Sequence, residues 1–179
     1  MKRMLFLWML AMLTLQPVSA QNPAGLTLQI IPTEYSSRIS PDASISFSTH
    51  GHFHVLLTNT STTPLRFFEE WNSWGESALS FEITYPNGQT VRSQKRPQLL
   101  REKNAPTTIT VEPGGFYVLD VTFTPTEWQL SPRLEKKFGK SMRCRMRAIY
   151  AIEPSEDARK EDTWTGTVSS SERVYTIWP

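Results

Sequence analysis

The sequence predicts an all-β protein in which two antiparallel sheets pack face to face as a β-sandwich. Along many short segments apolar and polar residues alternate, which is the period of a β-strand and not the 3.6-residue period of a helix. The 13 prolines and 8 glycines divide these segments at short intervals. Because Cys144 is the only cysteine, no internal disulfide can form, and the strands have to be held together by packing.

Residues 1–20 have the three parts of an export signal. Lys2 and Arg3 precede an apolar run at residues 4–15, and residues 17–20 offer the small side chains that a signal peptidase prefers. The run, about 12 residues long, is shorter than the ~20 residues that a membrane-spanning helix needs. We therefore expect cleavage after Ala20, export to the periplasm or the extracellular medium, no membrane span, and a single mature domain at residues 21–179.

The mature domain is expected to carry no net charge. Loss of Lys2 and Arg3 lowers the number of basic residues from 19 to 17, which equals the 17 acidic residues. A neutral domain has no general attraction to nucleic acid or to a membrane surface, and we expect no nucleic-acid partner.

In the first half of the mature chain, tight turns separate alternating segments. The odd positions keep their apolar character on both sides of Gly51, which predicts one long strand with a bend at that glycine. Pro64 begins a turn into a strand around Phe67 and Phe68, and residues 86–89 form a tight-turn sequence that predicts a hairpin. The expected strands are at residues 26–31, 45–57, 64–68 and 79–85.

In the second half, residues 92–106 have no period and are expected to form a long loop. Residues 109–111 and 117–123 are expected to form a second hairpin. A helical turn is expected only within residues 124–139, where Pro132 limits its length, and residues 153–162 are expected to be an acidic loop. Further strands are expected at residues 142–152, 164–168 and 174–178. The total of about eight or nine strands is that of an immunoglobulin-like antiparallel β-sandwich.

The segment at residues 142–152 has one apolar and one basic face. Cys144 shares its face with Met142 and Met146, which predicts a buried thiol. Arg143, Arg145 and Arg147 lie on the other face, within a locally basic stretch. They are candidate binding residues for an anionic polymer or a lipid headgroup; alternatively, they guard an edge strand and are neutralised by the acidic loop that follows.

A second candidate binding site is the aromatic segment that follows Phe68. Trp71 and Trp74 lie in a short loop directly after Glu69 and Glu70. We expect one indole to be buried and the other to stand at the rim, where a flat ring beside carboxylates suits a sugar or a side chain of a partner.

All three histidines of the chain, His50, His52 and His54, lie two residues apart on one expected strand. In an extended strand the outer two Cα atoms are about 13–14 Å apart, too far for both side chains to bind one ion. His52 and His54 are therefore the candidate ligands for zinc or copper, with a third ligand from a neighbouring strand. The alternative is that these histidines are solvated, since they lie opposite the core.

Three segments together resemble a known kind of domain: residues 56–61 and 64–65 (LLTNTS and PL), 110–115 (TVEPGG) and 145–150 (RMRAIY). In this order they are similar to exported bacterial immunoglobulin-like domains of unassigned function and, more distantly, to the BsuPI type of proteinase inhibitor. The resemblance implies the sandwich fold and inhibitor-like binding, and it brings no catalytic residue with it.

The sequence contains no catalytic motif of the kinds that mark hydrolases or phosphate-binding enzymes. We expect a protein that is not an enzyme, that needs no cofactor, and that binds a protein or a cell-envelope macromolecule. The alternative is a metal-binding domain or metal-dependent enzyme that uses the histidine strand. The oligomeric state is left open.

Overall fold

Twelve strands and one short helix are formed by the residues that the computed structural model describes, namely 25–35, 42–47, 52–97, 105–124, 126–129 and 141–178. The expected export signal and His50 lie outside these residues. No helix in the described ranges is long and apolar enough to cross a membrane.

The smaller face of the sandwich is an antiparallel sheet of three strands in the order β1-β3-β8, so β8 lies at its edge. Its strands are β1 (Leu26–Ile31), β3 (Phe53–Asn59) and β8 (Phe116–Val121). Every second residue of β3, from Phe53 to Asn59, is buried, while His52 and His54 are exposed. The alternation predicted from the sequence is confirmed for this strand.

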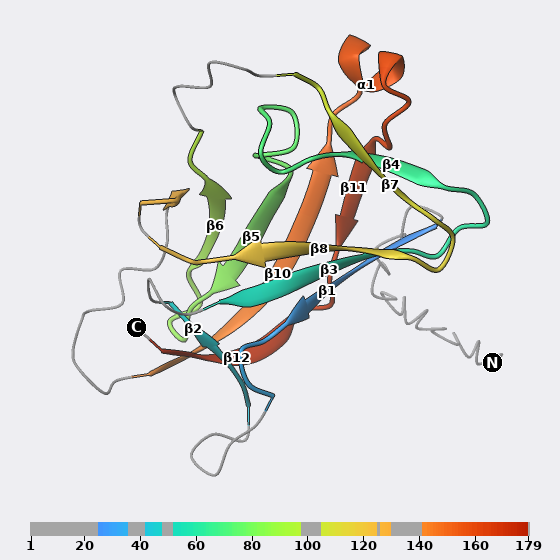
Figure 1. Cartoon of the computed structure of the whole chain (residues 1–179). Helices are drawn as coiled ribbons and strands as arrows, with labels where there is room; N and C mark the ends of the chain where they lie inside the picture. The colour runs from blue at the N-terminus through green and yellow to red at the C-terminus, as the bar shows by residue number, and fades with distance from the viewer. Residues whose placement is uncertain are drawn as a thin grey trace, which may run out of the picture.

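The larger sheet has the strand order β2-β12-β10-β5-β6-β9, and β11 also pairs with β10. Its strands are β2 (Ala43–Ser46), β5 (Leu79–Thr84), β6 (Thr90–Lys95), β9 (Trp128–Gln129), β10 (Met142–Ile152), β11 (Gly166–Ser169) and β12 (Arg173–Trp178). All neighbours are antiparallel except β2 and β12, which are parallel. Figure 1 shows the three-stranded sheet crossing in front of β5, β10 and β12.

A third, two-stranded sheet is formed by β4 (Leu65–Phe68) and β7 (Thr108–Val111). It lies near the short helix α1 (Glu156–Lys160), at one end of the sandwich (Figure 1). Asn59 ties this sheet to the end of β3. Its fully buried side-chain amide donates to the carbonyl oxygens of Thr63 and Val111, each at 2.8 Å, and its Oδ1 accepts from the backbone N–H of Ser61.

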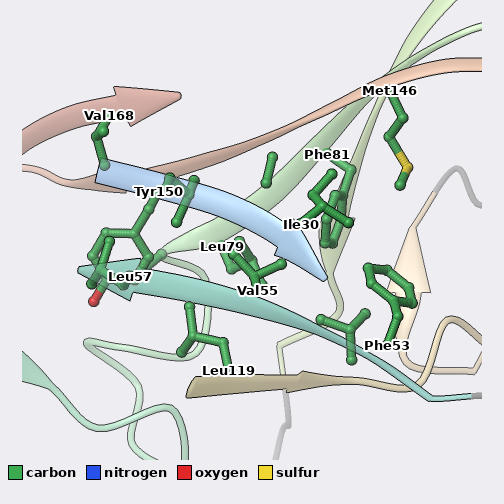
Figure 2. Close-up of a cluster of buried hydrophobic side chains, with 14 of the residues drawn as sticks. Ile30, Phe53, Val55, Leu57, Leu79, Phe81, Leu119, Met146, Tyr150 and Val168 are labelled. Atoms are coloured by element: carbon green, nitrogen blue, oxygen red, sulfur yellow. The ribbon is translucent and has the colours of Figure 1, made fainter. Parts of the chain in front are cut away.

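The core lies between the two large sheets. Figure 2 shows Val55, Leu57 and Leu119 of the three-stranded sheet facing Phe81 and Tyr150 of the larger one. Aromatic rings extend this core toward one end, with Phe53 and Phe81 5.5 Å apart and Phe123 stacked on Trp128 at 5.0 Å. The expected all-β sandwich is confirmed, and burial of these large apolar side chains is its main source of stability.

Three expectations about strand pairing are wrong. The expected long strand at residues 45–57 is divided between β2 and β3, which belong to different sheets. The expected second hairpin does not form, since β7 pairs with β4 and β8 pairs with β3. Residues 92–95 belong to β6 and not to a loop. β6 has no apolar period because it lies near the edge of its sheet, where Ser93 is buried through a hydrogen bond to Gln129.

The expectation of an acidic loop at residues 153–162 is also wrong, because this segment contains α1. Ser155 caps the helix by accepting a hydrogen bond from the backbone N–H of Ala158 at 3.0 Å. Acidic residues occupy its first turn and basic residues its last, which suits the helix dipole. The described part of residues 124–139 contains a turn and β9, not a helix.

Cys144 is 2% exposed, as expected from the alternation of β10, and burial raises the pKa of its thiol to about 11. The raised pKa lowers the fraction of the reactive thiolate, and burial keeps reagents away from the sulfur. We predict that a bulky thiol reagent labels the native protein at least about tenfold more slowly than the urea-unfolded chain. Equal rates in the two states would contradict the register of β10.

Candidate functional site

The loop at residues 69–76, which joins β4 to β5, holds the aromatic and acidic residues that the sequence singled out. It lies at the same end of the sandwich as α1 (Figure 1). The loop starts where Phe67 and Phe68 bury their rings in the core. Phe67 packs edge-on against Tyr150 at 6.0 Å, so the beginning of the loop is anchored to the larger sheet.

Asn72 gives the loop its conformation. Its side chain is fully buried, and its Oδ1 accepts hydrogen bonds from the backbone N–H groups of Trp74 at 3.1 Å and Gly75 at 2.9 Å. Its Nδ2 donates to the carbonyl oxygen of Thr107 at 2.9 Å. Because unpaired buried amides are costly, these bonds favour a single loop conformation.

Gly75 is required by close packing. A Cβ atom at this position would lie 2.3 Å from the carbonyl oxygen of Glu69 and 2.8 Å from that of Phe68. Backbone oxygens cannot yield as a flexible side chain can, so any other residue would force the loop open. The loop is therefore closed on itself where its two ends approach each other.

Trp74 is the partly buried indole. Its ring lies 6.3 Å from that of Phe68, and its Nε1 donates a hydrogen bond of 2.8 Å to Asp157 of α1. The short helix thus supplies the polar partner that a half-buried indole requires. Sequence reasoning treated this acidic segment as a loop and missed the partnership.

Trp71 is the exposed indole, with 49% of its surface accessible. The two indoles therefore differ in exposure as expected, but Trp74 is only partly buried and not fully buried. The preceding Glu69 is partly exposed, and its backbone N–H donates to Thr107 at 3.2 Å. The Trp71 side chain is thus exposed to solvent on a backbone that hydrogen bonds hold in place.

Glu70 turns inward, toward the edge strand β8. Its backbone N–H lies 3.5 Å from the Tyr117 hydroxyl, and its carboxylate lies 3.8 Å from Lys95 Nζ. Burial raises the pKa of Glu70; the positive charge of Lys95 opposes this shift, while the charge of Asp120 adds to it. The backbone of Asp120 also favours the charged form of the carboxylate and so acts against the rise in pKa.

Two tyrosines beside Glu70 were not singled out by the sequence. Burial, followed by the nearby charge of Glu70, raises the pKa of Tyr117 to about 12. Tyr150 is almost fully buried, which raises its pKa, and its hydroxyl is among the buried polar atoms of the described residues without a hydrogen-bond partner. The alternation of apolar residues in β8 and β10 predicts that both tyrosines face inward. No local pattern in the sequence links them to Glu70.

The three arginines of β10 lie on the outer face of the larger sheet, and the structure does not bring them together with Trp71. Arg147 Nη2 lies 2.9 Å from Glu82 of the neighbouring β5. Arg143 forms an ion pair with Asp42, and Arg145 forms one with Glu172. The basic face is thus interleaved with carboxylates.

His52 and His54 point to the outer face of the three-stranded sheet. His54 Nδ1 lies 2.5 Å from Asp120 Oδ1 across the β3–β8 pair, and His52 Nδ1 lies 3.0 Å from the hydroxyl of Thr122. Within the described ranges no group of three or more His, Cys, Asp or Glu residues could hold a metal ion. The metal-binding alternative stays a prediction.

No family model and no curated protein matches this chain. The resemblance to exported bacterial immunoglobulin-like domains and to the BsuPI type of inhibitor therefore stays a prediction.

We predict that the two loop tryptophans have unequal effects on stability. Trp74→Ala should lower the free energy of unfolding by about 2–3 kcal/mol, somewhat less than the ~3–5 kcal/mol of a fully buried tryptophan. Trp71→Ala should change it by less than about 0.5 kcal/mol, as exposed positions do. Urea denaturation of both variants checks this, and equal large losses would mean that both indoles belong to the core.

Glu70 should give stability a recognisable pH dependence. Its pKa in the folded state is raised above the ordinary glutamate value of 4.5, so the folded protein holds its proton to a higher pH than the unfolded chain does. Stability linked to this group is thus lost as pH rises through the folded pKa. Urea denaturation at about pH 4 and about pH 7 should show Glu70→Gln gaining stability relative to wild type at the higher pH. A constant difference would contradict the shift.

Proposed function

We propose that this protein is a non-enzymatic, exported binding domain that recognises a protein partner through the loop at residues 69–76. The observation that carries the proposal is Trp71, whose indole is 49% exposed on a loop held by the buried Asn72. Tryptophan is enriched among the residues that dominate binding energy. A loop that is already ordered loses little conformational entropy on binding.

The chemistry around Trp71 favours a basic side chain on the partner. Glu69 and Glu70 precede the indole, and Glu69 is partly exposed. A lysine or arginine over the face of an indole is attracted by its π electrons, and a nearby carboxylate adds to this attraction. An inhibitor is one kind of protein that binds in this way, because a rigid exposed loop presents its side chains ready for contact.

The surroundings of Glu70 support binding in preference to catalysis. Its carboxylate lies 3.8 Å from Lys95 of β6 and its backbone N–H lies 3.5 Å from the Tyr117 hydroxyl of β8, which gives Glu70 a role in holding the loop against both strands. A general acid or base must instead be free to reach the proton it transfers.

The proposal predicts that partner binding depends on Trp71. The mature domain is used as bait in an extract of the native cell envelope and in culture fluid, and a captured protein is then titrated in purified form. Trp71→Ala should weaken its affinity at least about tenfold, the effect of a residue that contributes about 1.4 kcal/mol or more to binding.

The matched control is Tyr35→Ala. Tyr35 is another large exposed side chain, at 59%, and it lies outside the loop. This variant should bind the captured partner like wild type. A partner that binds Trp71→Ala and wild type equally well would remove the loop as the recognition site.

A further inference from the structure

A groove with a volume of about 300 Å³ lies where β5 ends and β10 begins. Tyr85 and Pro86 of the turn after β5 line one side, and Val174 of β12 lines another. The groove is also lined by three residues of β10, namely Arg143, Cys144 and Arg145. The volume falls at the lower end of the range for small-ligand sites, which is about 300–1,000 Å³.

The groove has a positive lining. Arg143 and Arg145 both contribute to it, and no carboxylate is among the residues that line it. Burial raises the pKa of Tyr85 to about 12 and that of Cys144 to about 11, so both groups stay neutral at ordinary pH. Neither residue therefore brings a negative charge that opposes the two arginines.

Each arginine forms an ion pair with an acidic residue that does not line the groove. A ligand carboxylate can displace that acidic residue or bind beside it. Arg143 Nε lies 2.6 Å from Asp42 Oδ2, and Arg145 Nε lies 3.6 Å from Glu172 Oε1. The arginine side chains are 69% and 58% exposed, and such exposed pairs contribute little to stability. Both contacts use Nε, so the terminal nitrogens present an edge that fits a carboxylate.

The spacing of the arginines indicates what the groove can hold. They lie two residues apart on one face of β10, which places their Cα atoms about 6.6–7 Å apart. The same spacing separates side chains i and i+2 of an extended peptide. Val174, 39% exposed, and Pro86 offer apolar surface beside the two charges, which suits a peptide better than a bare inorganic anion.

We propose that this groove binds an extended acidic peptide segment of another protein, with carboxylates two residues apart that pair with Arg143 and Arg145. This site is separate from the Trp71 loop. The two lie at opposite ends of the six-residue strand β5 (Figure 1), a distance of about 20 Å. The proposal therefore stands whether or not the loop binds a partner.

The test uses two labelled peptides of the same composition, one with alternating glutamate and valine and one with its glutamates grouped in adjacent pairs. Fluorescence anisotropy with the full-length mature domain should give saturable binding of the alternating peptide at low salt. The paired peptide should bind at least about fivefold more weakly, because adjacent side chains of an extended chain point to opposite sides.

The variants separate this site from general charge attraction. Arg143→Gln with Arg145→Gln should weaken binding at least about tenfold, as expected when two charged contacts are lost. Arg173→Gln removes one charge from an exposed arginine outside the groove and should change affinity by less than about twofold. Arg143→Lys with Arg145→Lys keeps the charge and loses the planar edge, so it should give an intermediate loss.

Several outcomes would overturn the proposal. One is the absence of saturable binding up to about 1 mM peptide, the weakest affinity worth calling specific. Equal losses in Arg173→Gln and in the groove variants would reduce the effect to overall charge. Binding of polyphosphate or of anionic lipid vesicles that depends on Arg143 and Arg145, with no peptide binding, would assign the groove to another class of ligand. Circular dichroism confirms that each variant is folded.

Discussion

Two buried asparagine side chains hold the small sheet on which the exposed loop depends. Asn59 precedes β4 and bonds to Val111 at the end of β7, while Asn72 follows β4 and bonds to Thr107 just before β7 begins. β4 is thus attached to its partner strand beyond both of its ends. An unsatisfied buried amide costs more free energy than a hydrogen bond contributes. A conformation that breaks either bond is therefore strongly disfavoured. In a chain with a single cysteine, these amides do locally what disulfides do in disulfide-bonded domains.

The sequence predicts the strands of this fold better than their partners. Alternation in β3 and β10 identifies both strands and their buried faces, because side-chain direction is a local property. The parallel pairing of β2 with β12 brings together segments far apart in the chain, and no local pattern encodes it. α1 is a different case. Its cap at Ser155 and its ordered charges are visible in the sequence, but the many acidic residues around them suggest a loop.

The candidate site shows the same division. The sequence brings Glu69, Glu70, Trp71 and Trp74 into one loop and predicts that the two indoles differ in exposure. It does not predict that Glu70 turns toward Tyr117, since that contact joins residues 47 positions apart. It also does not separate Arg147, which pairs with Glu82 within the sheet, from Arg143 and Arg145, which line a groove. The small formal net charge of +2 hides two ends of different character, namely the loop at residues 69–76 with its glutamates and the groove with its two arginines.

The contact between Glu70 and β8 has a consequence for the behaviour of the protein at high concentration. β8 is an edge strand, and Phe116 and Val118 expose 63% and 42% of their surfaces on it. Such an edge invites another chain to add a strand, which is the first step of aggregation. The loop lies against this strand, since the backbone N–H of Glu70 is 3.5 Å from the Tyr117 hydroxyl. An incoming strand therefore meets the loop and the exposed carboxylate of Asp120. Proteolytic cleavage of the loop at residues 69–76 would uncover this edge and open it to strand addition. Fibre formation would then indicate that the loop proposed to bind a partner is no longer intact.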